Sequence, residues 1–366
     1  MLWMAVVSLG SLPTYAQDSA SYSFGSIEIH RVEVFDTLNH LDNNILGRFV
    51  NSLHILTKEN VIRRELLFTH GDPYSLPILE ESERNLRNMG IIADPTISVD
   101  TVKGHRVNVL VLTQDKWTIG FSASYKQEAG IRTGGFSLSD NNFLGNAQQV
   151  SASYNYSSER TNPNGTEFHF TENRLFNSRW STTEQYKNSE DLKIGTTLIE
   201  YPFYSEETNW SGGAYTDDGD QRVRLYDAGT LLAQDHRKQS NEKGWIIYSN
   251  GIIDKIRFGF GLQSTRSHTS ALPLNSFDNV DLATASVGAM HREYYEDSLI
   301  DNFGRTEDIS TGFSSSLVLG RNFFRSGQYV IPYFIQLGFQ HAGKASENAY
   351  FYQDISSRTF TNGVIL

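Results

Sequence analysis

Residues 115–125 read DKWTIGFSASY, and their alternating pattern is the first indication of how most of the chain folds. From Thr118 onward the even positions are small or polar, whereas the odd positions, Ile119, Phe121, Ala123 and Tyr125, are apolar. Successive side chains of a strand point to opposite faces, so the alternation predicts a strand with one polar and one apolar face. A soluble sheet packed on a core would give the same pattern, so the surroundings must be inferred from the rest of the chain.

Similar alternating runs recur after Trp117. They include QQVSASYNY (148–156), IRFGFGLQ (256–263), ISTGFSSSLVLG (309–320) and YVIPYFIQLGF (329–339), separated by the hydrophilic stretches SSERTNPNG, TDDGDQ and NSFDNVD, which we interpret as turns. Each run has about the ~9–11 residues of a membrane strand, and 22 Phe, 18 Tyr and 5 Trp can supply aromatic girdles. The pattern favours an antiparallel membrane β-barrel over a soluble sandwich, with ten or eleven strands in residues 118–366.

Composition narrows the class of protein. The 42 acidic and 31 basic residues give a net charge of −11, which argues against nucleic acid as the main partner. The chain has no cysteine, which excludes disulfides and thiolate metal sites. After residue 16 no segment approaches the ~20 apolar residues of a membrane helix.

The first residues resemble a secretory signal. An apolar run from Leu2 to Leu12 precedes Pro13 and the small residue Ala16, so we expect a signal peptide over residues 1–16 that is cleaved after Ala16. The polar residues 17–25 then form a linker. These features predict export.

Residues 26–117 combine helix-like and strand-like patterns, unlike the repeated alternation after Trp117. We expect a strand in SIEIHRVEVF, a helix in ENVIRRELLF with Thr57 as its N-cap, and a second helix in LPILEESERNLRNMG that ends at Gly90. Two strands follow, DPTISVDTV and HRVNVLVLT, joined by a turn at Lys103 and Gly104. The order β-α-α-β-β predicts a small α+β unit. Residues 36–56 remain unassigned.

A small α+β unit is followed directly by a long series of alternating strands, and this order resembles that of a known family. The segment from Asn51 to Ile92, followed by VNVLVLTQDKWT and DNNFLGN, resembles a POTRA domain leading into the barrel of a BamA/TamA-like outer-membrane assembly protein. The resemblance covers roughly residues 26–366 and rests on four signals: the IRREL helix, the Gly71-Asp72 break, the ERNL helix and the DKW entry into the barrel.

The resemblance implies a periplasmic POTRA domain at residues 26–117 and a bacterial outer-membrane β-barrel at residues 118–366. Members of this family insert or translocate polypeptides, so the expected partners are unfolded or secreted outer-membrane polypeptides, outer-membrane lipid and a periplasmic or lipoprotein accessory. The family barrel has sixteen strands and a late Arg-Gly-aromatic motif. This chain lacks the motif and ends in TNGVIL, so we expect a partial barrel that is truncated at its C-terminus.

No motif for covalent catalysis stands out, so we expect neither an enzyme nor a cofactor. We interpret His169 as a lumen-facing residue and Asp217, Asp218 and Asp220 as a solvated turn without metal. We assign Arg63 and Arg64 to a solvated helix face.

A mechanism can use backbone edges instead, because an unpaired strand edge can accept a client strand. One candidate edge is Pro95–Val102, with Ile97, Val99 and Val102 as client-binding residues. The other is the first barrel strand, with Ile119, Phe121, Ala123 and Tyr125 at the barrel seam. Two alternatives stay open: a passive channel with a periplasmic domain, and a surface structural or adhesive barrel protein.

Overall fold

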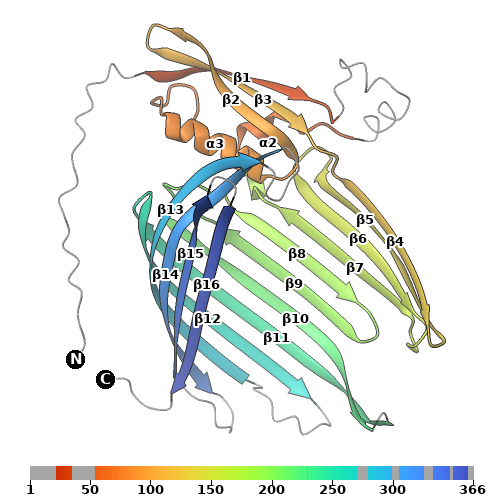
Figure 1. Cartoon of the computed structure of the whole chain (residues 1–366). Coiled ribbons are helices and arrows are strands. Elements are labelled where there is room, and N and C mark those ends of the chain that lie inside the picture. The colour runs from red at the N-terminus through yellow and green to blue at the C-terminus, as the bar shows by residue number, and fades with distance from the viewer. Residues whose placement is uncertain are drawn as a thin grey trace, which may run out of the picture.

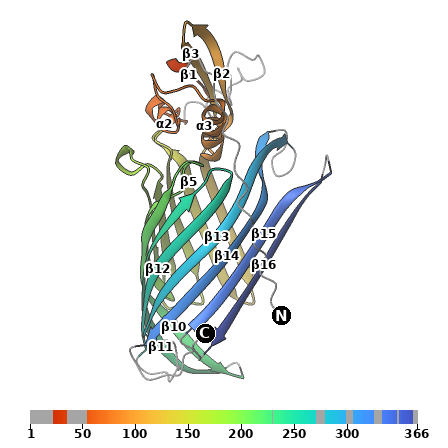
Figure 2. The same ribbon diagram turned by 90° about the vertical axis from the view of Figure 1, so that its left-hand side faces the viewer.

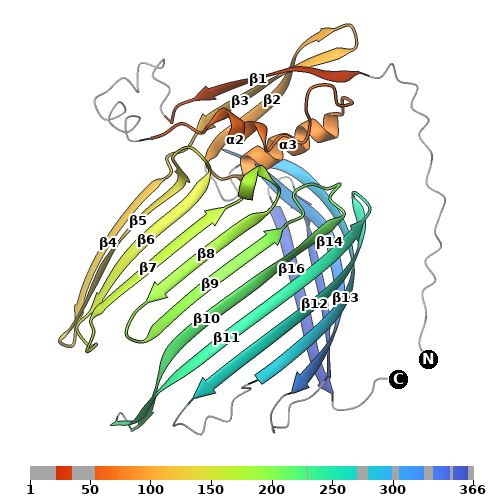
Figure 3. The ribbon, with the colours of Figure 1, turned by 180° about the vertical axis from the view of Figure 1, so that it is seen from behind.

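The computed structural model describes residues 22–34, 54–228, 230–269, 279–298, 305–324, 333–346 and 349–361. The predicted signal peptide, most of the unassigned stretch 36–56, Tyr329 and Ile331 of the last alternating run, and residues 362–366 lie outside these ranges. The described chain forms a small sheet with two helices and a large curved sheet, and the helices lie between the two sheets (Figures 1 and 3).

The small unit has the predicted order of elements. They are β1 (Ser23–Val32), α2 (Glu59–Arg63), α3 (Leu76–Asn88), β2 (Ile92–Lys103) and β3 (Arg106–Asp115). The sheet order is β1-β3-β2, in which β1 runs parallel and β2 antiparallel to the central strand β3. Therefore β2 is an edge strand of the small sheet, as predicted for Pro95–Val102.

One hydrophobic core joins the helices to the small sheet. Ile62 of α2 and Leu86 of α3 are buried against Val109 and Val111 of β3. Phe24 of β1 stacks on Phe68 with 4.1 Å between the ring centroids. Burial of large apolar side chains contributes about 1.5–3 kcal/mol each, so this cluster can hold the small unit together.

Three boundaries in the small unit differ from the prediction. The first helix ends at Arg63 rather than Phe68, because the amide of Leu67 donates to Ser82 Oγ at 2.9 Å instead of continuing the helical ladder. Its N-cap is Lys58, since the Thr57 hydroxyl binds Asp115. The first strand begins at Ser23, within the stretch predicted as linker. The second helix fits the prediction, with Gly90 at φ 74° just beyond its end.

The large sheet has thirteen antiparallel strands, more than the ten or eleven predicted. The hydrophilic segment TDDGDQ, which resembles a turn in the sequence, continues as a strand, because its residues pair with both neighbouring strands. The segment SSERTNPNG does form a turn between two strands, as predicted. The strands are β4 (Ile119–Glu128), β5 (Ile131–Phe143), β6 (Gln148–Ser157), β7 (Asn164–Glu172), β8 (Ser181–Asn188), β9 (Leu192–Tyr201), β10 (Trp210–Asp227), β11 (Thr230–Asn250), β12 (Asp254–Thr269), β13 (Asn279–Ser298), β14 (Thr306–Phe324), β15 (Tyr333–Ser346) and β16 (Ala349–Thr361). A short 3-10 turn, η1 (Leu175–Asn177), lies between β7 and β8.

Each strand of the large sheet pairs with its sequence neighbours, so β4 and β16 are the two ends of the sheet. The sheet curls like the wall of a barrel that is open between these ends (Figures 1 and 2). The small unit lies over the end of the sheet where β4 begins, which we call the proximal end (Figure 1). Among the described residues, no helix is long and apolar enough to cross a membrane.

Candidate functional site

The edge of β2 is divided into two parts. Side chains in its first half are partly covered by α3, and Ile97 is only 5% exposed. The second half extends beyond the helices, and there Val99 and Val102 are 44% and 54% exposed. Of the three predicted client-binding residues, Val99 and Val102 are therefore accessible as side chains, whereas Ile97 belongs to the core.

The four predicted seam residues lie on β4, which ends the large sheet. Their partners on β5 are Asp140, Leu138, Phe136 and Gly134, so the other side of β4 forms the sheet edge. Phe121 and Tyr125 are strongly exposed. On the opposite face of the same strands, the hydroxyl groups of Ser122 and Ser137 are 2.8 Å apart. The strand thus has one apolar and one polar face, as its alternation predicts.

Only residues 116–118 separate β3 of the small sheet from β4 of the large sheet. The amide of Lys116 donates to the carbonyl of Ile91 at 2.7 Å, and the hydroxyl of Thr118 donates to Asp140 Oδ1 at 2.8 Å. These bonds fix the connection from both sides. We call residues 115–118, together with the residues that bind them, the joint.

The carboxylate of Asp115 is the centre of the joint. Its Oδ2 atom accepts hydrogen bonds from the backbone amide of Thr57 at 2.7 Å and the hydroxyl of Thr57 at 2.8 Å, and lies 2.8 Å from Nε2 of His54. Asn142, at the end of β5, donates to the Thr57 hydroxyl oxygen at 2.8 Å. Asp115 and its three partners are buried, so the bonds are made away from water. They connect the small unit to the first hairpins of the large sheet.

The turn between β5 and β6 completes the joint. Its Gly145 has φ 71°, and a Cβ atom there would lie 2.6 Å from the carbonyl oxygen of Leu56. The amide of Lys58 donates to the Gly145 carbonyl at 2.9 Å. The DNNFLGN segment therefore needs glycine at this position, both for its backbone conformation and for the close approach of the small unit.

Ion pairs hold the small unit to the next proximal turn. Glu65, buried after α2, binds Arg174 and lies 3.9 Å from Arg179, both in the segment between β7 and β8. Arg64 donates to the carbonyl of Asn146 at 2.9 Å and is largely buried. The prediction that Arg63 and Arg64 share a solvated helix face is therefore wrong for Arg64, because it contacts the large sheet. Arg63 is about half exposed and pairs with Glu59.

The second helix makes the next contacts. The Glu81 carboxylate accepts a hydrogen bond from the amide of Glu206 in the turn between β9 and β10. Burial raises the pKa of Glu81 above its ordinary value. The guanidinium of Arg84 lies over the ring of Tyr294 on β13, 4.1 Å from the ring centroid. The sequence gives no sign of these contacts, because their partners are more than a hundred residues away.

The convex face of the large sheet is apolar over a broad belt. Along β12, Phe258 and Phe260 are 54% and 51% exposed, and Ile256 and Leu262 on the same face are similarly exposed. The residues between them belong to the concave face, where Arg257 packs on the Phe203 ring of the turn before β10. The four apolar positions span about 20 Å along the strand at ~3.4 Å per residue. Such a belt fits the ~25 Å apolar band of a membrane barrel.

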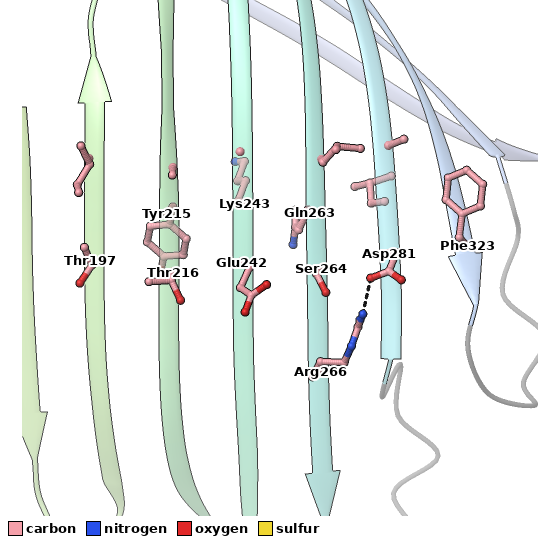
Figure 4. Close-up of a pocket in the computed structure, with 16 residues that line it drawn as sticks. Thr197, Tyr215, Thr216, Glu242, Lys243, Gln263, Ser264, Arg266, Asp281 and Phe323 are labelled. Carbon is pink, nitrogen blue, oxygen red and sulfur yellow. Dashed lines mark hydrogen bonds and ion pairs between the residues drawn. The ribbon is translucent and has the colours of Figure 1, made fainter. Parts of the chain in front are cut away.

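A cavity of about 850 Å³ lies over β9 to β14 (Figure 4). Small side chains such as Thr197, Thr216 and Ser264 line it, and Arg266 binds Asp281 at its margin with an N–O distance of 2.7 Å. Because this ion pair lies on the same face of β12 as Phe260, it marks where the apolar belt becomes polar. We interpret the cavity as part of the outer surface.

The aspartate cluster predicted as a turn lies within β10. Asp217 is buried and accepts a hydrogen bond from Asn241 at 2.8 Å, and Asp220 binds His236 at 2.8 Å. Residue-by-residue pairing with β11 extends the strand through Gly219, so the turn prediction is wrong. Within the described ranges, no group of three His, Asp or Glu residues could hold a metal ion. His169 lies on β7 beside Thr171, on the polar face of the sheet.

Comparison with known proteins gives one sequence match. The chain is 30% identical over 112 residues to the outer membrane protein assembly factor BamA of Neorickettsia risticii, a match that covers 28% of this chain. The chain spans 15% of the length of that relative. No family model matches the chain.

Solved structures also align at low similarity. BamA from Haemophilus ducreyi lacking POTRA domains 1–3 aligns with a TM-score of 0.34 and 11% identity, covering 92% of this chain and 81% of that one. CdiB from Acinetobacter baumannii aligns with a TM-score of 0.33 and 10% identity, covering 93% and 71%. The sequence match to the outer-membrane assembly factor BamA over 112 residues confirms the predicted resemblance to a BamA/TamA-like protein.

Proposed function

We propose that this chain is an outer-membrane protein that assists the insertion or translocation of other polypeptides. The small unit acts as a periplasmic POTRA domain, and the large sheet is the wall of a membrane barrel. The sequence similarity to BamA supports this assignment, as does the apolar belt on the convex face of the sheet.

The observation that carries the proposal is the arrangement of two strand edges around one joint. The edge strand β2 pairs with β3, and β3 continues through residues 116–118 into β4, the end strand of the large sheet. A client polypeptide can add as a strand to either edge, since main-chain hydrogen bonds make little demand on sequence. The short joint keeps the two edges in a fixed relation.

Strand addition at β2 depends on backbone amides that point away from β3. The hydrogen bond that the amide of Ile97 donates to a side chain of α3 shows that this amide points away from β3. Alternate amides along an antiparallel strand point to the same side, and the register is regular from Ile97 to Val99. We therefore expect the amide of Val99 to face a client strand.

A single substitution tests this role. Val99→Pro removes the amide without breaking a bond to β3, and Val99→Ala is the matched control that keeps it. A cysteine introduced at Val102 in the full chain, which has none of its own, can be crosslinked to a cysteine in an unfolded outer-membrane polypeptide. We expect Val99→Pro to lower the crosslinking yield about tenfold and Val99→Ala to leave it unchanged. Equal yields for the two variants would overturn strand addition at β2.

The same variants distinguish polypeptide assembly from the function of a passive channel. A channel with a periplasmic domain would conduct ions steadily and would give no crosslink between Val102 and the polypeptide in any variant. That result would overturn the proposed assembly function and would identify the protein as an ion-conducting channel.

A further inference from the structure

The covered half of the β2 edge is occupied by a side chain. Glu83 of α3 accepts the amide hydrogen of Ile97 through its Oε2 atom at 2.8 Å. A backbone donor at a sheet edge needs a partner, and here a carboxylate supplies it. A client strand that extends from Val99 toward Ile97 must therefore displace Glu83.

Glu83 is also tied to the large sheet. Its Oε1 atom accepts a hydrogen bond from Arg87, one helical turn later, at 2.8 Å. Arg87 also donates to Asp308 of β14 at 2.7 Å and lies 3.1 Å from Glu296 of β13. The side chains of Arg87 and Asp308 are 9% and 7% exposed, so this contact is screened little by solvent. One continuous chain of polar contacts thus runs from the edge amide to a hairpin of the barrel wall.

Arg87 is the residue that joins these contacts. The guanidinium of Arg87 binds three carboxylates at once, and the position of one of them, Glu83, is fixed by the amide of Ile97. If a client carbonyl replaces Glu83 at that amide, the constraint on Arg87 changes. Coupling between two such sites must be reciprocal and is typically 5–150-fold in affinity.

We propose that Glu83 is a displaceable gate on the β2 edge, and that its displacement by a client strand loosens the Arg87 clamp on β13 and β14. The inference rests on the proposed function, because it assigns a regulation to the same edge. Binding of a client strand at β2 would therefore change how tightly the small unit contacts β13 and β14 of the large sheet.

The test uses the full chain in detergent and a synthetic ten-residue peptide of alternating apolar and polar residues as the probe. Glu83→Ala frees the amide of Ile97, so we expect the peptide to bind about tenfold more tightly than to the native chain. Glu83→Gln keeps a weaker acceptor and should give an intermediate affinity. Glu80→Ala, at an exposed position on the same helix, is the matched control and should leave the affinity unchanged.

A second readout reports the clamp. We expect saturating peptide to increase hydrogen exchange in the segments 290–298 and 305–310 of the native chain, and to add no further increase in Glu83→Ala, where the clamp no longer responds to the edge. An unchanged or weaker affinity in Glu83→Ala, with wild-type binding intact, would overturn the gate and leave the proposed function standing. Failure of the peptide to bind any variant would overturn both.

Discussion

Removal of the Asp115 carboxylate should open the joint between the two sheets. In Asp115→Ala, the buried amide and hydroxyl of Thr57 lose their acceptor and His54 loses its partner. A buried donor left without a partner costs about 1–3 kcal/mol, and loss of a buried charged partner about 3–5 kcal/mol in all. We therefore expect the joint to lose about 3–5 kcal/mol of local stability. Asp115→Asn keeps one acceptor oxygen and should lose about 1–2 kcal/mol.

Hydrogen exchange measures this directly, because the Thr57 amide is itself one of the donors. At about 1.4 kcal/mol per factor of ten, exchange of a peptide covering residues 54–61 should accelerate by about two to three and a half orders of magnitude in Asp115→Ala and about tenfold in Asp115→Asn. Asp100→Ala, on the exposed half of β2, is the control and should exchange as the native chain does. Exchange in Asp115→Ala within twofold of the native rate would refute the assignment of Asp115 as the centre of the joint.

Two further predictions concern the acid of α3 and the convex face. Because the pKa of Glu81 is raised by burial, the folded state holds this proton more tightly than the unfolded state does, so its contribution to stability falls as pH rises above the ordinary value of 4.5. Glu81→Gln should remove that part of the pH dependence from the thermal transition of the full chain, and an identical pH profile in both proteins would contradict the burial argument. Phe260→Arg places a charge in the apolar belt and should cost about 2–4 kcal/mol of stability in lipid, whereas Gln263→Arg on the concave face should cost little. Equal losses of folded protein in vesicles, measured by urea titration, would show that the belt does not face lipid.

The sequence predicts the elements better than it predicts their connections. Period-two alternation around Phe121, Phe258 and Leu337 places apolar side chains on one face, and the structure leaves all three exposed on that face. The signals of α3, with Pro77 in its first turn and Gly90 after its end, are local, so its bounds follow closely. Strand faces and helix ends can be predicted because they depend on steric preferences between residues that are neighbours in the sequence.

The missed features depend on distant partners. The segment TDDGDQ resembles a turn because its polar residues disfavour burial, but pairing with β11 gives Asp217 and Asp220 their partners. Thr57 resembles an N-cap, but Asp115 competes for its hydroxyl. Ile97 looks like an accessible edge residue, but α3 covers it and Glu83 takes its amide. In each case a tertiary contact overrides the local preference.

Site-specific disulfide crosslinking along β4, during assembly of an outer-membrane polypeptide, tests whether client strands add to this edge of the large sheet. The chain has no cysteine, so single cysteines at positions 121 to 125 can each be paired with single cysteines in the client. Strand addition at this edge predicts crosslinks that shift by one client residue for each step along β4, in a continuous antiparallel or parallel register. Crosslinks without a register, or none at any β4 position while the full chain stays folded in the membrane, would show that client strands do not add to β4.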